Sequence, residues 1–460
     1  MANISYQKTE RAESDKKMNL HLEDARRSHD EGAKKITREV SGQEMKSKEK
    51  PLVVYFHRYP PEYEAEQFTV MRDLFDSLLP HYRMVYYCMK GAKRPDEKLR
   101  RGLEVIEMPL TINRTHARDK WVKTLMYYAY LPIALNNLRK LKPAFIVSKE
   151  TLPFLPSLTG RLKVPMFIEA SDWWWSILLG KSPLGRKIAQ ALESIEVHHW
   201  NRAHALVVAH SLREAKLLEQ KGMQKERIRV INATLYPEVY FPCNAKEERK
   251  MLGGKNQWIA AVHGIIHPSK GYDQLLAWWK NIVLVHPGWK LMIIGGAGGE
   301  SWCKNEIKRL GIENNVIMTG WLPTQESVNK HLNAADCLLV TRRNTEDNAG
   351  VIPSSLYHSM QTGKPTIATG MEGMSEIVQH KVSGYLYEPD NFESFKAVLE
   401  HIESHPQEAE KVGKAGIKRA KECFDPATAT AKYCKIIDDL LKEPQGKTTS
   451  SATKSPAQLR

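Results

Sequence analysis

Short runs of consecutive apolar residues recur along this chain, and segments with helical periodicity, such as 272–285 and 391–402, lie between them or follow them. The first run is Leu52-Val53-Val54-Tyr55-Phe56. A strand covered by helices on both faces shows such a continuous apolar run, which is typical of parallel sheets. The recurrence therefore predicts an α/β protein.

The pattern occurs twice. The first series of strands is expected at residues 52–56, 84–88, 144–147, 166–169, 205–208 and 229–231, and the second at 258–263, 290–295, 316–319, 337–341, 366–369 and 384–387. Pro237 and Pro242 lie between the two series. A chain of 460 residues also suits two domains better than one. We therefore predict two doubly wound Rossmann-like domains that face each other across a cleft.

The domain limits follow from this pattern. We expect a disordered charged tail at 1–50, an N-terminal Rossmann-like domain at 51–235, a linker at 236–256, a C-terminal Rossmann-like domain at 257–425, a closing helix at 426–445 and a disordered tail at 446–460. Both tails are polar and lack apolar periodicity.

The segment from Asp336 to Thr369 predicts a phosphate site. It has the pattern of a strand, a polar loop, a short helix and a second strand. The helix is expected to begin at Pro353, since proline at the first helical position loses no hydrogen bond, and to end at Gly363. Ser354 and Ser355 then lie where the exposed amides collect. A helix N-terminus at the carboxyl end of a parallel strand favours phosphate.

Several motifs of the C-terminal half occur in the order and at the spacing of one enzyme family. They are Lys270-Gly271 with Asp273, the glycines of 295–299, the Val316–Leu322 segment, Ala335-Asp336, the helix at Pro353, Gly363-Lys364-Pro365, Glu376-Ile377-Val378 and Ser383-Gly384-Tyr385-Leu386. Residues of about 165–445 thereby resemble the family 4 glycosyltransferases. These are retaining enzymes of the GT-B fold that use nucleotide-diphosphate sugars.

The resemblance implies that the domain at 51–235 binds the acceptor and that the domain at 257–425 binds the nucleotide sugar. It also implies a donor site without a metal or a cofactor. Lys270 would stabilise the charge that develops on the leaving diphosphate. The donor-binding residues that the resemblance and the loops around it imply are Gly264, His267, Ser269, Lys270, Gly295, Gly296, Leu322, Asn348, Gly350, Val351, Ser354, Ser355 and His358.

Three family positions lack the expected side chain. The arginine of the first loop falls on Ile265, and two glutamates separated by seven residues fall on Gly350 and His358. His358 can still hydrogen-bond a ribose. The role of the first glutamate would pass to Asn348, to Asp347 or Glu346, or to backbone amides at 350 and 351. These departures affect the predicted chemistry more than the predicted fold.

The acceptor is expected at strand ends of the N-terminal domain. His57 and Asp172 are predicted there as catalytic residues, together with Lys270. Asp172 is followed by three tryptophans, residues 173–175, which would stack on a sugar, lie at a lipid interface or pack in the core.

Charge and composition limit the partners. The formal net charge is +15, and residues 81–142 hold 14 Lys and Arg against 5 Asp and Glu. One interpretation is a core-facing helix at about 119–141 with a solvated basic rim. The other is a surface for an anionic membrane or an anionic substrate. No nucleic-acid partner is expected, since no recognised binding motif accompanies the charge.

Localisation is predicted from absent signals. The six cysteines show no paired spacing, so neither a disulfide framework nor a zinc site is expected. No signal peptide or apolar run of roughly 18 to 20 residues is found. We therefore expect a cytoplasmic protein, which the membrane interpretation would place on the cytoplasmic face of a membrane.

The predicted function is transfer of a sugar from a nucleotide-diphosphate sugar to a glycan or lipid-linked acceptor, with retention of configuration. The alternative is a non-catalytic GT-B protein that binds a nucleotide sugar or scaffolds a glycan-assembly complex. The missing arginine and glutamates motivate that alternative.

Overall fold

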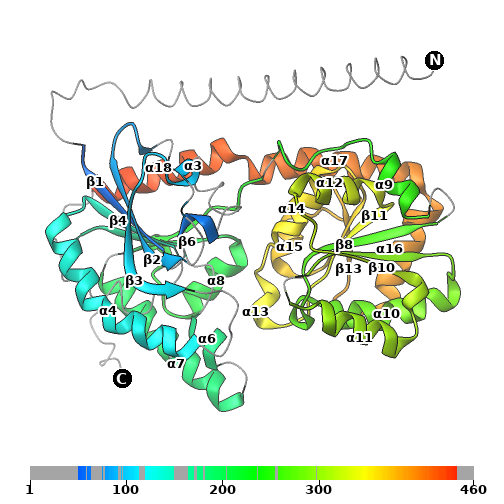
Figure 1. Cartoon of the computed structure of the whole chain (residues 1–460), viewed down its shortest axis with the longest axis horizontal. Coiled ribbons are helices and arrows are strands. Elements are labelled where there is room, and N and C mark those ends of the chain that lie inside the picture. The colour runs from blue at the N-terminus through cyan, green and yellow to red at the C-terminus, as the bar shows by residue number, and fades with distance from the viewer. Residues whose placement is uncertain are drawn as a thin grey trace, which may run out of the picture.

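Two parallel β-sheets, each covered by helices, form two domains that lie side by side (Figure 1). The computed structural model describes residues 50–57, 60–63, 75, 78–91, 95, 97–112, 120–149, 164–169, 174–179, 182–203, 205–235, 237–253, 257–296 and 298–442. The α/β class and the two parallel sheets predicted from the apolar runs are confirmed.

The first sheet has seven parallel strands in the order β3-β2-β1-β4-β5-β6-β7. Their bounds are β1 (Leu52–Phe56), β2 (Arg83–Gly91), β3 (Glu104–Ile112), β4 (Phe145–Lys149), β5 (Met166–Glu169), β6 (Leu206–Ala209) and β7 (Ile228–Val230). Val54 and Phe56 pack on one face of the sheet, and Val53 and Tyr55 pack on the other. Both faces are therefore core, which is why the strands have no polar alternation.

Strand β3 was not among the predicted strands. Its sequence, EVIEMPLTI, mixes polar and apolar residues instead of forming a continuous apolar run. It lies at the edge of the sheet and pairs only with β2 among the described strands. An edge strand is partly open to solvent, so the burial that produces an apolar run is absent there.

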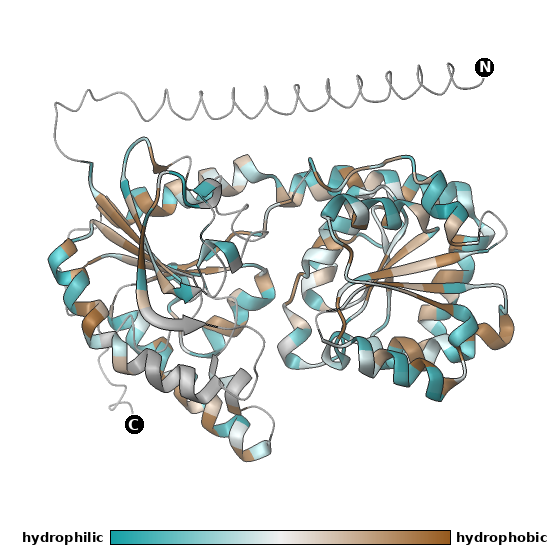
Figure 2. Ribbon diagram, viewed as in Figure 1, coloured by the Kyte–Doolittle hydropathy of each residue, from teal (hydrophilic) through white to brown (hydrophobic). Residues whose placement is uncertain are grey.

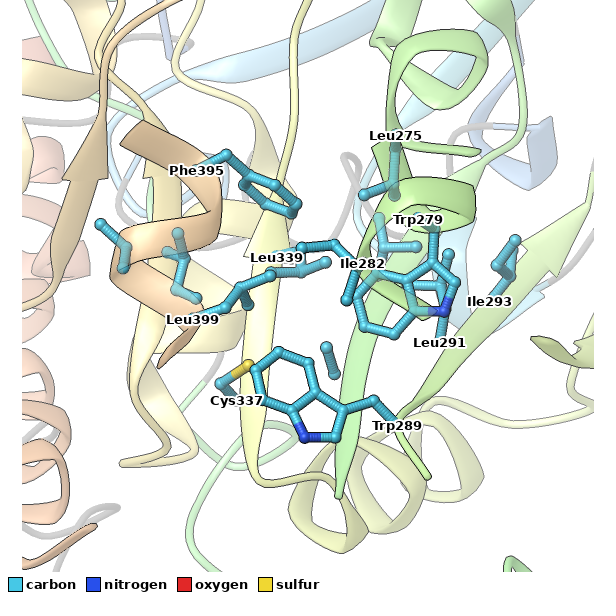
Figure 3. Packing of buried hydrophobic residues seen from close by; sticks show 14 of the residues in the cluster. Leu275, Trp279, Ile282, Trp289, Leu291, Ile293, Cys337, Leu339, Phe395 and Leu399 are labelled. Atoms are coloured by element: carbon cyan, nitrogen blue, oxygen red, sulfur yellow. The ribbon is translucent and has the colours of Figure 1, made fainter. Parts of the chain in front are cut away.

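The second sheet has six parallel strands in the order β10-β9-β8-β11-β12-β13. Their bounds are β8 (Ile259–Ile265), β9 (Lys290–Gly296), β10 (Val316–Gly320), β11 (Cys337–Val340), β12 (Thr366–Thr369) and β13 (Tyr385–Tyr387). All six predicted strands of this series are present, with ends that differ by at most two residues. Trp279 and Trp289 fill the core on one face, together with Leu339 and Phe395 (Figure 3).

Helices surround both sheets, with apolar strands inside and more polar helix faces outside (Figure 2). The first domain holds α3 (Glu97–Arg100), α4 (Lys120–Leu141), α6 (Trp174–Leu179), α7 (Pro183–Arg202) and α8 (Leu212–Gln220). The second holds α9 (Lys246–Met251), α10 (Tyr272–Val285), α11 (Glu300–Leu310), α12 (Gln325–Ala334), α13 (Glu346–Ala349), α14 (Ser354–Gln361), α15 (Glu372–Ile377), α16 (Phe392–Ser404) and α17 (Pro406–Phe424). Helix α9 lies inside the segment expected as a linker.

The last helix returns to the first domain. Helix α17 packs beside α14 in the second domain, and α18 (Pro426–Lys442) lies over the first sheet (Figure 1). Tyr433, Ile436 and Leu440 are buried against Tyr55 and its neighbours. The Tyr433 hydroxyl also donates to Glu169 Oε1 at 2.7 Å. The predicted closing helix is therefore part of the core of the first domain.

Within the described part of the chain, no helix combines the length and the apolar character needed to cross a membrane.

Candidate functional site

The carboxyl edge of the second sheet brings together the loops after β8 and β11. These strands are neighbours in the sheet but are not consecutive in the chain. Loops diverge at such a point and leave room for a ligand. Thr341 Oγ1 donates to the carbonyl oxygen of Lys270 at 3.1 Å, which joins the end of β11 to the loop after β8. Lys270 therefore lies at the edge where a ligand is expected.

Two glycines pair at this edge. Gly264 of β8 is in register with Gly295 of β9, and both have positive φ, 122° and 135°. A Cβ on Gly295 would fall 2.0 Å from the carbonyl oxygen of Gly264, so the approach of the two strands requires this glycine. A Cβ on Gly264 would meet nothing within 4 Å. Gly264 is thus the member of the pair that borders open space.

A polar network fixes the loop after β8. His267 Nδ1 lies 2.7 Å from Ser269 Oγ and accepts from the Ser269 amide at 3.2 Å. Asn348 Nδ2 donates to the carbonyl oxygen of Ser269 at 3.2 Å and to that of Arg343 at 3.0 Å. The side-chain amide of Asn348 thereby holds the loops after β8 and β11 together.

The N-terminus of α14 begins one residue later than predicted. Pro353 is the N-cap residue, with φ −72° and ψ 146°, and the helix starts at Ser354. The expected first helical position for Pro353 was therefore wrong by one residue, because its ψ is extended. Ser354 is exposed and Ser355 half-buried. The first amides of a helix have no intrahelical acceptor, so this end can still bind an anion.

His358 is enclosed by aromatic rings. Its ring stacks on Tyr240 with the centroids 3.9 Å apart and an angle of 13°, and His263 lies 5.9 Å away. Burial lowers the pKa of His263 to about 4. Burial, with His263 beside it, also holds the pKa of His358 well below its usual value. Both imidazoles are therefore neutral at physiological pH. Tyr240 and His263 were not predicted as site residues, since neither stands in a recognised motif.

Gly350 lies at the contact between the two domains. The Ser211 hydroxyl, next to α8 of the first domain, donates to the carbonyl oxygen of Gly350 at 2.7 Å. A Cβ on Gly350 would lie 3.0 Å from Glu214 Cγ and 3.1 Å from the Glu214 nitrogen. A side chain at this position, such as the glutamate of the family, would therefore require α8 to shift by a few tenths of an ångström. Val351, the next residue, is half-buried.

A carboxylate of the second domain caps α8. Glu376, in α15, accepts from the amide of Leu212 at 2.8 Å and from that of Arg213 at 2.9 Å. Arg213 Nε also lies 3.5 Å from Glu372 Oε1. Figure 1 shows α8 facing α13 and α15 across the boundary between the domains. Negative charge at a helix N-terminus is favourable, so these contacts hold the two domains together.

The predicted acceptor residues are described in part. His57 directly follows β1 and is 4% exposed, with Nδ1 2.8 Å from the Tyr86 hydroxyl. Asp172 and Trp173 lie outside the described residues. Trp175 Nε1 donates to Glu196 Oε1 at 2.9 Å, which ties α6 to α7. At least one of the three tryptophans thus has a packing role.

Other predicted donor residues are placed as follows. Gly296 is buried in β9, opposite Ile265. Leu322 is half-buried and packs on the apolar cluster that contains Tyr240. Neither residue is brought directly against Lys270 by a recorded contact. Their donor-binding roles stay predictions, as do those of the other site residues.

Two arginines at the end of β11 add positive charge that was not predicted. Arg342 and Arg343 directly follow Thr341. The Arg342 amide donates to Thr369 Oγ1 at 3.1 Å, and Arg343 Nε lies 3.9 Å from Asp273 Oδ2. The sequence did contain a usable signal, since two consecutive arginines end an expected strand. Among the described residues, no group of three or more His, Cys, Asp or Glu side chains could hold a metal ion.

Comparison with protein families matches residues 244–419 to the family described as glycosyl transferases group 1. A glycosyltransferase of uncharacterised function from Haemophilus influenzae is 27% identical over 195 residues, which cover 42% of this chain and 50% of the relative. A D-inositol 3-phosphate glycosyltransferase from Segniliparus rotundus is 27% identical over 229 residues, which cover 48% and 50%. The chain thus spans about half the length of the curated relatives it matches.

Solved structures resemble a larger part of the chain. Anabaena Alr3699/HepE, crystallised with UDP and glucose, superimposes with a TM-score of 0.65 at 17% identity, covering 85% of this chain and 100% of that one. WaaG, a glycosyltransferase involved in lipopolysaccharide biosynthesis, gives 0.59 at 16% identity, covering 84% and 99%. At these identities the likeness shows the fold alone, the two-domain GT-B arrangement that the sequence predicts.

Proposed function

Because residues 244–419 belong to the glycosyl transferases group 1 family, we propose that this protein is a retaining glycosyltransferase. It moves a sugar from a nucleotide-diphosphate sugar to a glycan or lipid-linked acceptor. The observation that supports this most directly is the meeting of Lys270 and the end of β11 at the open carboxyl edge of the second sheet. The complex of the Anabaena protein with UDP-glucose supports a nucleotide sugar as the donor.

The chemistry needs stabilisation of the leaving diphosphate. Cleavage of the bond between the sugar and the phosphate develops negative charge on the phosphate oxygens. Lys270 supplies one positive charge, and the amides of Ser354 and Ser355 supply a favourable dipole. His358 is neutral and hydrogen-bonds the ribose hydroxyls in place of a carboxylate. His57 and Asp172 face the acceptor from the first domain.

Turnover of nucleotide sugars by the purified full chain tests the proposal. The donor panel is UDP-glucose, UDP-galactose, GDP-mannose and ADP-glucose, with release of the nucleoside diphosphate as the measurement. We expect release with one donor, and a decrease of about 100-fold or more in Lys270→Ala. Arg309→Gln is the control for loss of a positive charge, because Arg309 is exposed and pairs with Glu306 on α11. Equal release by wild type and Lys270→Ala would contradict the role of Lys270.

The second candidate function is the non-catalytic GT-B protein. The buried Gly350, which packs closely against α8 where the family has a carboxylate, is the observation that favours it. Binding of a nucleotide sugar with no release from any donor, even with lipid extracts and glycans added as acceptors, would support this candidate. It would also contradict the transferase.

We also propose that the basic block at 81–142 docks the protein on an anionic membrane. Lys50, Arg83, Lys140 and Lys142 line a groove of about 970 Å³ at the amino end of the first sheet. Arg83 is paired with Glu104 at 2.9 Å, which reduces its contribution. Several other basic residues of the block lie outside the described residues. Flotation with phosphatidylserine vesicles at low salt, lost at high salt, is expected; absence of flotation at low salt would rule docking out.

A further inference from the structure

Arg342 is buried at its Nε atom without an acidic partner. That atom has no accessible surface and no hydrogen bond. No carboxylate of the described residues lies within 4.0 Å of the guanidinium, and the recorded contact of Arg342 is its backbone bond to Thr369. Burial lowers the pKa of Arg342, and the nearby Tyr272 opposes that shift. Burial raises the pKa of the Tyr272 hydroxyl, so this group is uncharged and does not neutralise the arginine.

Two other half-buried arginines of the described chain, Arg100 and Arg249, are neutralised by acids. Arg100 Nε lies 2.6 Å from Glu62 and its Nη2 2.7 Å from Glu107. Arg249 Nη1 lies 2.9 Å from Asp336. Burying part of a guanidinium is unfavourable unless an anion compensates. Arg342 has no such compensation among the described residues, so its surroundings fit an anion from outside.

Arg342 lies beside the loop that carries Lys270. A Cβ built on Gly271 would fall 3.2 Å from the Arg342 nitrogen, so the two backbones are in direct contact. Strands β8 and β11 are paired, with Val262 opposite Leu339. The end of β11 and the end of β8 therefore meet at one point. Among the described residues at this point, Asp273 Oδ2 lies 3.9 Å from Nε of the neighbouring Arg343.

We propose that Arg342 binds the diphosphate of the nucleotide sugar and supplies, from the end of β11, the positive charge that Ile265 cannot supply from the loop after β8. This inference rests on the proposed function. A guanidinium presents its N–H groups as a planar fork that suits two phosphate oxygens. With Lys270 it would place two cations on the leaving group.

Calorimetric titration with nucleotides tests this inference on the full chain. UDP, GDP and ADP are titrated into the wild type, and the one that binds most tightly is compared with its nucleoside. Arg342→Gln should weaken binding of the diphosphate by about 10- to 100-fold and leave binding of the nucleoside unchanged. Arg342→Lys keeps the charge without the fork and should weaken it by about 3- to 10-fold. The control Arg309→Gln loses the same charge far from the site and should bind like the wild type.

The outcomes separate the inference from the proposed function. If the wild type binds no nucleoside diphosphate, both are contradicted. If it binds one, and Arg342→Gln binds it equally well, the inference alone is overturned. Equal loss of diphosphate and nucleoside binding would also overturn it, because that pattern indicates a structural role. If Arg342→Gln does not fold, Arg342→Lys takes its place. Diphosphate binding equal to that of the wild type, or an equal loss of diphosphate and nucleoside binding, then overturns the inference.

Discussion

The carboxylate of Glu376 is expected to keep the two domains in contact by capping α8. The change that tests this is Glu376→Gln. The carboxylate accepts two hydrogen bonds, from the amides of Leu212 and Arg213. Glutamine has one acceptor oxygen, and its NH₂ group would face the second amide donor. One hydrogen bond is thereby lost, and so is the favourable charge at the helix N-terminus.

The size of the effect follows from the exposure of these groups. A buried hydrogen bond to a charged acceptor contributes about 1.5–3 kcal/mol. The Leu212 side of this contact is exposed, with Leu212 at 58%. Because solvent screens this contact, Glu376→Gln should reduce the free energy that holds the domains in contact by about 1–2 kcal/mol. That corresponds to about a 5- to 30-fold larger population of the separated domains.

Hydrogen exchange of a peptide that covers the start of α8 provides the assay. The amides of Leu212 and Arg213 should exchange about 5- to 30-fold faster in Glu376→Gln. Glu372→Gln is the matched control, because Glu372 lies 3.5 Å from Arg213 Nε and its side chain is 58% exposed. Such a surface pair contributes at most about 0.5 kcal/mol. Unchanged protection of α8 in Glu376→Gln would refute the capping argument.

Three further changes test the packing of each domain. In denaturant unfolding, Gly295→Ala should destabilise the second domain by about 3 kcal/mol or more, because the alanine Cβ would lie 2.0 Å from the Gly264 carbonyl oxygen. The control Gly298→Ala places its Cβ in open space and should reduce the free energy of unfolding by only about 1–2 kcal/mol. Trp279→Ala should cost about 3–5 kcal/mol by the same measurement, since Trp279 is fully buried; a loss below about 1 kcal/mol would contradict that packing. Burial raises the pKa of Glu196 to about 8 in the folded state. Between about pH 4.5 and pH 8 the folded protein therefore keeps a proton on Glu196 that the unfolded chain has released. Stability should therefore fall as the pH rises from about 4.5 to 8. Glu196→Gln keeps the acceptor for Trp175, so its melting temperature should match that of the wild type near pH 5 and exceed it at pH 9. If the melting temperatures of the two proteins change in parallel with pH, Glu196 is not a protonated buried acid.

The apolar runs predicted the fold well because burial on both faces of a strand leaves a direct trace in sequence. Every predicted strand of the second sheet is present. Strand β3 left no such trace, since an edge strand is only partly buried. Secondary structure was therefore predictable where the strand is covered on both faces.

The candidate site was less predictable because its geometry depends on contacts between distant segments. The sequence placed Gly350 where a carboxylate is expected, but only the structure shows α8 occupying the space beside it. The pattern gave no reason to connect Tyr240 with His358, which are 118 positions apart and stack directly. Arg342 carried a local signal, but its lack of an acidic partner is a property of the folded chain.

The return of α18 to the first domain has a consequence for how the protein forms during synthesis. A ribosome exposes the residues of the first sheet long before it reaches residue 426, and domains fold in general as their chain emerges. Here Tyr433, Ile436 and Leu440 complete the apolar face around Tyr55. That face stays uncovered until residues 433–440, which follow the second domain, have been made. The second domain can therefore acquire its core before the first, so that the order of folding reverses the order of translation.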